Sequence, residues 1–290
     1  MSPSTHDLSP IARPGGGLAM VAMDQRESLR DMFDQAGRGR PADDVLTRFK
    51  LDVAEVLGPL ASAFLIDRHY GFEQVRDVLP ASTGLILAAD ELTQEDGGPV
   101  EETAIDAVVA RQDLAGVVAL KLLIIWRRDA LRERRVELAR DFIALARERG
   151  VLSVLEPVVR RSTEADWDAE VAIREAAREL SALRPDLYKV QVPLAGTGDE
   201  AQQREASRLL NEAIATPWVV LSQGVERERF LPAVRAACLE GASGFLAGRA
   251  LWSDVVGADD VPAVLRERSV PRLEALIETV DDVATDWRTR

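Results

Sequence analysis

Eight short apolar segments recur along this chain at a nearly constant spacing. They are rich in valine, isoleucine, leucine and alanine and are bounded by turn residues, which is typical of strands buried on both faces of a parallel sheet. The segments cover residues 17–24, 61–67, 84–90, 117–126, 152–159, 187–193, 218–224 and 244–251. Their first residues lie about 32 positions apart on average, which is the spacing of βα units in a barrel of roughly 250 residues.

The segments between these strands have the three- and four-residue apolar periodicity of amphipathic helices. Alternating strands and helices predict an α/β protein, and eight such units favour a single-domain (β/α)8 TIM barrel. An open doubly wound sheet is the alternative, but its glycine-rich turn should follow the first strand, whereas the glycines at 15–17 precede it or open it. We therefore expect a barrel domain over residues 15–290, with a helical extension over residues 261–290 and a flexible N-terminal tail over residues 1–14.

The overall charge and the rarity of cysteine and histidine exclude several classes of function. The formal net charge of −13 leaves no general basic surface for nucleic acids or anionic membranes. The longest apolar run, residues 117–126, is interrupted by Lys121 and has about half the length of a membrane-spanning helix. One cysteine, Cys238, and two histidines provide no cluster for a structural zinc site and fit the reducing cytoplasm.

Charged side chains gather at the carboxyl ends of the predicted strands, which is where barrel enzymes place their catalytic groups. Any of them alone could instead be a structural ion-pair partner. The candidates are Asp24, Gln25 and Arg26 after the first strand, Asp67 and Arg68 after the second, Asp90 and Glu91 after the third, Lys121 in the fourth, Glu156 in the fifth and Lys189 in the sixth.

Lys189 lies in an apolar strand on the face opposite to Tyr188, Val190 and Val192. The apolar face should contact the helices, so we expect Lys189 to point into the barrel. Burial beside a second cation such as Lys121 lowers the pKa of an amine and makes it nucleophilic. A lone strand lysine is more simply an ion-pair partner, but two lysines with two inward carboxylates favour Schiff-base chemistry.

Two further features fit such chemistry. Glu156 precedes a proline at the end of its strand and could act as a general acid or base on a substrate hydroxyl. The last two strands are followed by glycines and by donors of hydrogen bonds, which is the usual phosphate site of a TIM barrel, although the glycines could serve only the turns. The predicted phosphate-binding residues are Ser222, Gly224, Gly248 and Arg249.

The chain resembles the class I aldolases of the tagatose-1,6-bisphosphate group and, within that group, is most similar to the bacterial sulfofructose-phosphate aldolases. The resemblance rests on the segments GLAMVAMDQRESLR, ALKLLIIWR, LEPVVR, DLYKVQVPLAG, PWVVLSQGV and GASGFLAGRALW, and it covers nearly the whole chain. It implies a TIM barrel that needs neither a metal nor a cofactor. Two segments depart from the pattern: Gln191 replaces an expected acid, and the residues after the second strand, DRHYGF, differ.

The resemblance also implies residue roles and a reaction. Lys189 matches the Schiff-base lysine, Lys121 matches the lysine beside it, and Glu156 matches the general acid/base. The substrate-facing loop is matched by Asp24, Gln25 and Arg26. The cradle for the C1 phosphate is matched by Ser222, Gly248 and Arg249. The expected reaction is cleavage of 6-deoxy-6-sulfofructose 1-phosphate to dihydroxyacetone phosphate and sulfolactaldehyde, a step of sulfoglycolysis, with Lys121 keeping Lys189 neutral by repulsion and Asp24 orienting one of the amines. Gln25 and Arg26 are expected to bind the sulfonate.

Other functions stay open at this point. A tagatose- or fructose-1,6-bisphosphate aldolase would use the same lysine and would bind a phosphate at each end of its substrate. A non-catalytic barrel that senses a sugar phosphate, and an isomerase that only transfers protons, are more distant alternatives. We expect a cytoplasmic homo-oligomer with a small ketose phosphate as its ligand.

Overall fold

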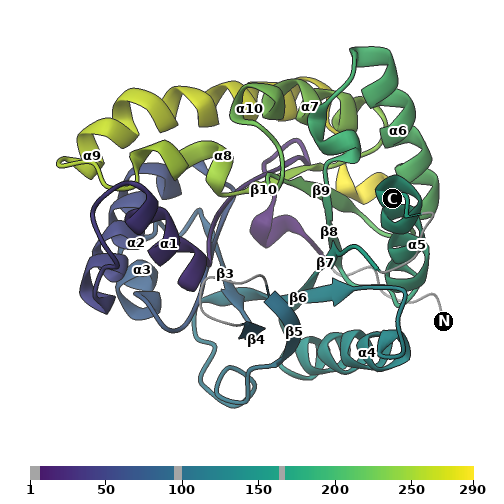
Figure 1. The fold of residues 1–290 in the computed structure, drawn as a ribbon, viewed down its shortest axis with the longest axis horizontal. Coiled ribbons are helices and arrows are strands. Elements are labelled where there is room, and N and C mark those ends of the chain that lie inside the picture. The colour runs from purple at the N-terminus through teal and green to yellow at the C-terminus, as the bar shows by residue number, and fades with distance from the viewer. Residues whose placement is uncertain (1–6, 95–99, 163–166) are drawn as a thin grey trace.

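A computed structural model describes residues 7–94, 100–162 and 167–290 of the chain. Eight parallel strands close into a barrel in the order β1-β10-β9-β8-β7-β6-β3-β2 (Figure 1). The strands are β1 Leu18–Met23, β2 Ala63–Ile66, β3 Gly84–Ala88, β6 Val117–Trp126, β7 Leu152–Val159, β8 Leu187–Gln191, β9 Trp218–Leu221 and β10 Gly244–Ala247. Pairing of β1 with β10, which sets Leu18 opposite Gly244, closes the barrel and confirms the predicted TIM-barrel fold.

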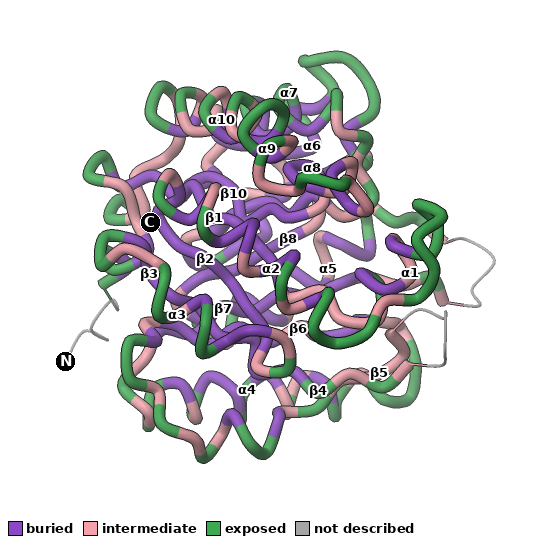
Figure 2. Tube along the Cα trace, turned by 90° about the vertical axis from the view of Figure 1, so that its left-hand side faces the viewer, coloured by how far each residue is buried: buried purple, intermediate pink, exposed green. Residues whose placement is uncertain are grey.

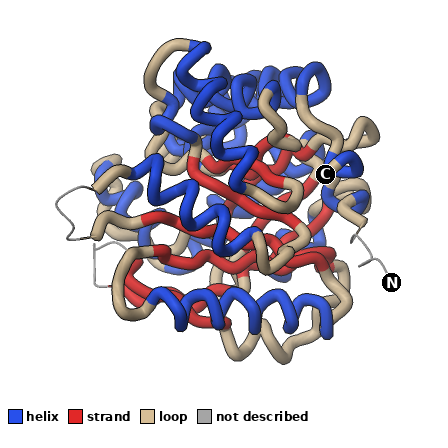
Figure 3. The backbone as a smooth tube through the Cα atoms, turned by 90° about the vertical axis from the view of Figure 1, so that its right-hand side faces the viewer, coloured by secondary structure: helices blue, strands red, loops and turns tan. Residues whose placement is uncertain are grey.

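Helices surround the barrel, as the apolar periodicity between the strands predicts (Figure 3). They are α1 Glu27–Gln35, α2 Asp43–Leu57, α3 Phe72–Val78, α4 Arg132–Glu148, α5 Ala169–Ser181, α6 Glu200–Ala213, α7 Arg227–Leu239, α8 Arg249–Trp252, α9 Val261–Val264 and α10 Val270–Val283. Side chains cap several of them: Asp168 accepts hydrogen bonds from the first turn of α5, and Asp199 forms a capping box with Gln202 in α6. None of the described helices has the length and apolar character needed to cross a membrane.

The barrel strands are mostly buried (Figure 2). Alternation along them divides the core into two clusters, one inside the barrel and one between the barrel and its helices. In β8, for example, Leu187 joins the inner cluster, whereas Tyr188 and Val190 join the outer one. Lys189 therefore belongs to the inward-facing set, as its position in the strand predicts.

A two-stranded hairpin interrupts the βα repeat between β3 and β6, and the sequence did not predict it. It consists of β4 Asp90–Gln94 and β5 Val100–Ile105, paired antiparallel, with β5 packed against β6 and α4. Arg127 fixes the hairpin through an ion pair of 2.7 Å with Glu101. The hairpin lies at the carboxyl end of the barrel because β4 begins directly after the end of β3.

The N-terminal segment and one strand end differ from the sequence prediction, whereas the C-terminal extension agrees with it. Leu8 and Ile11, at a short 3-10 helix, are buried against the inner cluster at the amino end of the barrel, so only residues 1–6 of the predicted flexible tail lie outside the described residues. The segment predicted as the last strand, residues 244–251, ends as a strand at Ala247, because the chain turns at Gly248 into α8. The C-terminal helical extension is present as α9 and α10, joined by a π-helical turn.

Candidate functional site

Five charged side chains, each on or after a different strand of the barrel, meet at its carboxyl end. Asp24 follows β1, Asp90 follows β3, Lys121 lies in β6, Glu156 in β7 and Lys189 in β8. All five line one cavity at the centre of the barrel mouth. Parallel strands bring their carboxyl ends to the same edge, so residues far apart in the sequence converge here.

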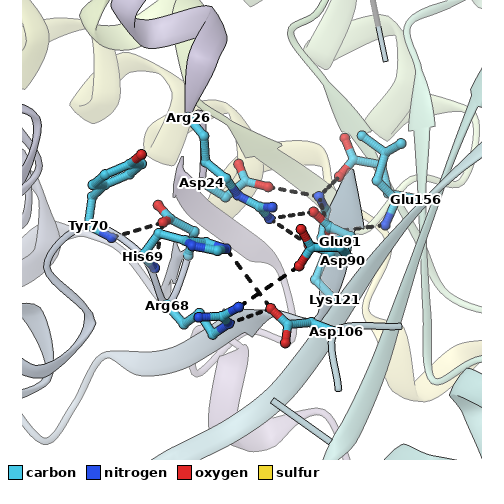
Figure 4. Close-up of polar contacts among 12 residues, drawn as sticks. Asp24, Arg26, Arg68, His69, Tyr70, Asp90, Glu91, Asp106, Lys121 and Glu156 are labelled. Carbon is cyan, nitrogen blue, oxygen red and sulfur yellow. Dashed lines mark hydrogen bonds and ion pairs between the residues drawn. The ribbon is translucent and has the colours of Figure 1, made fainter. Parts of the chain in front are cut away.

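Lys121 is the centre of this cluster (Figure 4). Its Nζ lies 2.7 Å from Asp24 Oδ2, 3.1 Å from Asp90 Oδ1 and 2.9 Å from Glu156 Oε2. Burial alone would lower the pKa of Lys121, but the three carboxylates outweigh it and raise this pKa well above its ordinary value. Lys121 is therefore a permanent cation at neutral pH.

Lys189 has fewer anionic neighbours than Lys121. Its Nζ lies 2.9 Å from Glu156 Oε1, and this is its one ion pair among the described residues. Its side chain is almost fully buried, yet it lines the cavity. Among the described residues, Lys189 thus shares Glu156 with Lys121 but lacks the two further carboxylates that contact Lys121.

Asp24 is held as an anion by both lysines. Burial opposes its charge, but Lys121 and Lys189 together lower the pKa of Asp24 well below the ordinary carboxyl value. Of the two amines, it is Lys121 that Asp24 contacts directly. Asp24 is accordingly a poor proton acceptor and a good anchor for the Lys121 ammonium group.

The next two residues of the loop, Gln25 and Arg26, both line the cavity but contact different residues. Arg26 is tied to Asp90: its Nη2 donates hydrogen bonds of 2.7 Å to the carboxylate and 2.8 Å to the backbone carbonyl of that residue. The amide nitrogen of Gln25 instead lies against Gly248, in the predicted phosphate cradle. The structure thus does not bring these two side chains together as a free binding site for a distal anion.

Most of the predicted phosphate-binding residues meet beside the lysines. The hydroxyl of Ser222 accepts long hydrogen bonds of 3.4 and 3.5 Å from the backbone N–H groups of Gly248 and Ala250, and Arg249 lines the same side of the cavity. A Cβ atom at position 248 would lie 2.5 Å from the carbonyl oxygen of Ala22, so the close approach requires glycine. Gly224 does not line the cavity; its φ of +80° identifies it as a turn residue.

Arg249 has no carboxylate within ion-pair distance among the described residues. Burial lowers its pKa, and the nearby charges of Glu156 and Asp24 only partly offset this effect. A half-buried guanidinium without a partner favours the arrival of an anion. This arrangement fits the predicted binding of a phosphate.

Several cavity residues were not identified as candidates from the sequence. They include Leu92, Gln94 and Val100 of the hairpin, and Arg160, which directly follows β7. The signal for Arg160 was its place after a predicted strand, in the segment LEPVVR. The hairpin residues carried no chemical signal, because their role depends on an insertion that the repeat does not predict.

The residues after β2 form a separate structural cluster. Asp67 is fully buried and pairs with the equally buried Lys50 of α2, which the sequence did not single out. Its other oxygen accepts hydrogen bonds from the backbone of His69 and Tyr70, and neither Lys50 nor Asp67 lines the cavity.

Arg68 lies farther out, where His69, Glu91 and Asp106 approach one another. Arg68 Nε forms an ion pair with Asp106, and its Nη2 lies 3.9 Å from Glu91 (Figure 4). A guanidinium therefore already supplies positive charge to these carboxylates.

Comparison with known proteins shows the family of the chain. Residues 18–254 match the model of the DeoC/LacD family aldolases. Tagatose 1,6-diphosphate aldolases from Listeria monocytogenes and Staphylococcus aureus are 28% and 26% identical to the chain; the matches cover 98% of this chain and 93% and 97% of those proteins. In fold, a fructose-bisphosphate aldolase from Plasmodium falciparum is similar with a TM-score of 0.71 at 14% identity, over 96% of this chain and 93% of that chain. The chain belongs to the DeoC/LacD family of class I aldolases.

Proposed function

We propose that this aldolase cleaves a ketohexose 1,6-bisphosphate, with tagatose 1,6-bisphosphate as the first candidate, through a Schiff base on Lys189. The observation that carries the proposal is the contact of 2.9 Å between Lys189 Nζ and Glu156 Oε1 in a cavity that Ser222 and Arg249 also line. It joins a nucleophile, a proton acceptor and an anion site, which are the three parts that aldol cleavage of a phosphorylated ketose requires.

The first half of the reaction forms the imine. Lys189 transfers a proton to Glu156 and attacks the C2 carbonyl of the ketose with the freed electron pair. Loss of water from the carbinolamine then gives a protonated imine, with Glu156 returning the proton to the departing hydroxyl. The positive charge of the imine replaces that of the ammonium group, so the charge of the cavity is conserved.

The second half breaks the carbon–carbon bond. Glu156 removes the proton of the C4 hydroxyl, the C3–C4 bond breaks with its electrons passing to the imine, and the aldehyde leaves. The resulting enamine takes a proton at C3, and hydrolysis of the new imine releases dihydroxyacetone phosphate and regenerates Lys189. Each step moves a proton between Glu156 and a reacting atom, as general acid–base catalysis requires.

We propose a different role for Lys121 from the one expected from the sequence. Because three carboxylates surround it, its charge is more than balanced, and its net effect on Lys189 is not simple repulsion. We assign it to holding Glu156: its Nζ contacts Oε2, while Lys189 contacts Oε1 of the same carboxylate. This orients Glu156 between the nucleophile and the substrate.

The phosphate on C1 is assigned to the side of the cavity formed by Ser222, Gly248 and Arg249. Arg249 provides a planar set of donors, and the backbone N–H groups of the adjoining turn now bonded to Ser222 add further donors. A phosphate here would place C2 of the ketose toward Lys189, because β8 and β10 are separated only by β9.

The choice among candidate substrates depends on the group that the ketose carries on C6, at the end distal to the C1 phosphate. The relatives named above are tagatose 1,6-diphosphate aldolases, which favours a bisphosphate over the sulfofructose phosphate expected from the sequence. Both substrates share the C1 phosphate and the cleaved bond, and they differ in the charge of the group on C6.

The test is to compare kcat/KM for cleavage of tagatose 1,6-bisphosphate, fructose 1,6-bisphosphate and 6-deoxy-6-sulfofructose 1-phosphate under the same conditions. We expect a bisphosphate to be the best substrate and tagatose 1,6-bisphosphate to lead. A clear preference for the sulfonate would overturn the substrate assignment and leave the Schiff-base mechanism intact. No cleavage of any ketose phosphate would overturn the proposed function.

A further inference from the structure

Two arginines of the cavity have no ion-pair partner among the described residues, and they follow different strands. Arg249 comes after β10, on the side assigned to the C1 phosphate. Arg160 comes after β7 and is half-buried, and its buried Nε has no hydrogen-bond partner within the part of the chain that the structure describes. Burial lowers the pKa of Arg160, and the neighbouring charge of Arg127 lowers it further. An isolated guanidinium in this position is energetically unfavourable until an anion arrives.

Three other arginines at this end of the barrel are paired with carboxylates. Arg26 is paired with Asp90, Arg127 with Glu101 and Arg68 with Asp106. Gln25 and Arg26 were the sequence-based candidates for the distal anion, but the charge of Arg26 is already paired at 2.7 Å with the buried carboxylate of Asp90. Arg160 has no such ion pair among the described residues.

The backbone at Arg160 is held in place on both sides. Its own N–H donates to the carbonyl oxygen of Trp126 in β6 at 3.0 Å. The N–H of the preceding residue, Val159, donates at 2.7 Å to the side-chain oxygen of Gln191 in β8. Gln191 thus ties the end of β7 to the strand that carries Lys189. Arg160 is therefore presented on a fixed strand end, as a specificity-determining residue requires.

The order of groups around the barrel matches the order of atoms along a ketose. Arg249 follows β10, Lys189 lies in β8, and Glu156 and Arg160 belong to β7 and its end, in the barrel order β10-β9-β8-β7. A substrate with its C1 phosphate at Arg249 and its carbonyl at Lys189 therefore has its C4 hydroxyl near Glu156. Its remaining carbons then extend toward Arg160, which lies four residues beyond Glu156 in the sequence.

We infer that Arg160 binds the anionic group at the distal end of the substrate and so sets the preference for a ketose 1-phosphate that has a second negative charge. This inference rests on the proposed function, because it takes the C1 phosphate and Schiff-base assignments as its frame. A phosphate or a sulfonate on C6 shares the required chemistry, and Arg160 offers either one a fork of N–H donors.

The test is to measure Arg160→Gln with substrates that differ only in the distal group. For a ketose 1,6-bisphosphate we expect KM to rise roughly 10- to 100-fold, which is the loss of a charged hydrogen-bonded contact. Cleavage of the corresponding ketose 1-phosphate, which lacks the distal anion, should keep its kcat/KM. Including 6-deoxy-6-sulfofructose 1-phosphate tells whether a sulfonate depends on Arg160 as a phosphate does.

A second readout separates the two anion sites. Borohydride trapping of dihydroxyacetone phosphate on the enzyme needs only the C1 phosphate, so Arg160→Gln should trap it at the same concentration as the wild type. The matched control is Arg161→Gln, which removes the same charge from the exposed neighbouring residue that does not line the cavity. Arg160→Lys keeps the charge and alters the core least, so it is measured as well in case Arg160→Gln folds poorly. We expect Arg160→Lys to raise KM for the bisphosphate and to leave KM for the 1-phosphate unchanged.

Three results overturn the inference. An unchanged KM for the bisphosphate in both Arg160 variants would show that the side chain does not contact the substrate. An equal loss for the 1-phosphate and for trapping of dihydroxyacetone phosphate would place Arg160 at the C1 phosphate instead. A loss of the same size in Arg161→Gln would mean that only the general charge of the region matters. Absence of any trapped adduct in the wild type would be a failure of the proposed function and is distinguishable from all three.

Discussion

Two clusters of buried charge lie at the same end of the barrel, and only one of them is open to a substrate. Lys50 and Asp67 form a closed pair in which both side chains are fully buried. The ring of Tyr70 lies 5.3 Å from the Lys50 ammonium and 5.3 Å from the Arg30 guanidinium. Burial lowers the pKa of Lys50, with Asp67 opposing the shift. Nothing in this cluster faces the cavity, so its contribution is to the fold.

The second cluster shares its charges among more groups and faces the cavity. Lys121 and Lys189 both contact Glu156, and two further carboxylates contact Lys121. The two clusters thus contain the same kinds of group, lysines and carboxylates. They differ in how many partners each lysine has and in whether the lysine is accessible from the cavity. Burial of a charge alone does not mark a catalytic group; burial together with an open cavity and an uncommitted anion site does.

The use of lysine in the whole chain sharpens this contrast. Of the 36 basic residues, only three are lysines, namely Lys50, Lys121 and Lys189, and all three are buried. The rest of the 36 basic residues are arginines, whose guanidinium groups do not form Schiff bases at neutral pH. The chemistry of a lysine ε-amino group is therefore confined to the two clusters, and substitutions can test each one separately.

The largest expected effect is on turnover. Lys189→Ala removes the nucleophile, and we expect kcat to fall by about 10⁴-fold or more, as when a covalent nucleophile is deleted from other enzymes. The free energy of unfolding should change less than in Lys50 variants, because Glu156 keeps Lys121 as a partner at 2.9 Å. Cleavage kinetics and urea unfolding of the same preparation measure both. Retention of substantial turnover would contradict the assignment.

The opposite pattern is expected for Lys50→Met. It leaves Asp67 as an uncompensated buried charge, so the free energy of unfolding should fall by about 3–5 kcal/mol. The folded enzyme should retain its kcat/KM, since Lys50 does not line the cavity. Urea unfolding followed by tryptophan fluorescence gives the stability, and adding Asp67→Leu should restore part of it. Loss of turnover in a folded Lys50→Met variant would show that the two clusters are coupled, and would contradict the assignment of the Lys50 cluster to the fold alone.

A smaller effect is expected at the C1 phosphate. Arg249→Gln removes a charged donor and should weaken binding of dihydroxyacetone phosphate by about 1.5–3 kcal/mol, roughly 10- to 100-fold in Kd. Isothermal titration calorimetry measures this directly. The matched control is Arg161→Gln, for which we expect unchanged affinity. Equal affinity in wild type and Arg249→Gln would remove Arg249 from the phosphate site.

The smallest expected effect concerns pH. Because the two lysines lower the pKa of Asp24, its ionised form stabilises the folded state fully above the ordinary carboxyl pKa of about 4. This contribution is lost as pH falls below that value toward the lower pKa of the folded protein. Between about pH 5 and about pH 3, Asp24→Asn should therefore lose less stability in urea unfolding than the wild type does. An equal loss in both would show that Asp24 is not stabilised as an anion.

The sequence was sufficient to predict the barrel and to place the charged candidates at its carboxyl end. The βα repeat located all eight barrel strands, and residue parity placed Lys189 and Glu156 inside, because a strand buried on both faces still alternates between the barrel interior and the helices. Its errors were at the ends of elements: residues 248–251 turn into α8, and Leu8 and Ile11 are packed.

Features that depend on long-range contacts were not predictable. The partner of Asp67 is Lys50, which lies on a helix 17 residues earlier and has no local signal of its position. The hairpin residues Leu92, Gln94 and Val100 approach the cavity through an insertion that the repeat does not contain. Arg26 and Arg160 look equivalent in sequence as basic residues that follow strands, and only the bond between Arg26 and Asp90 distinguishes them.

The identity of the reacting amine is the central claim, and chemical trapping tests it most directly. The enzyme is reduced with borohydride in the presence of dihydroxyacetone phosphate and cleaved at arginine, which leaves each of the three lysines on a different peptide. Mass mapping should find the adduct on the peptide that contains Lys189 and unmodified peptides for Lys50 and Lys121. An adduct on Lys121, or none on any lysine while the enzyme is active, would contradict the account.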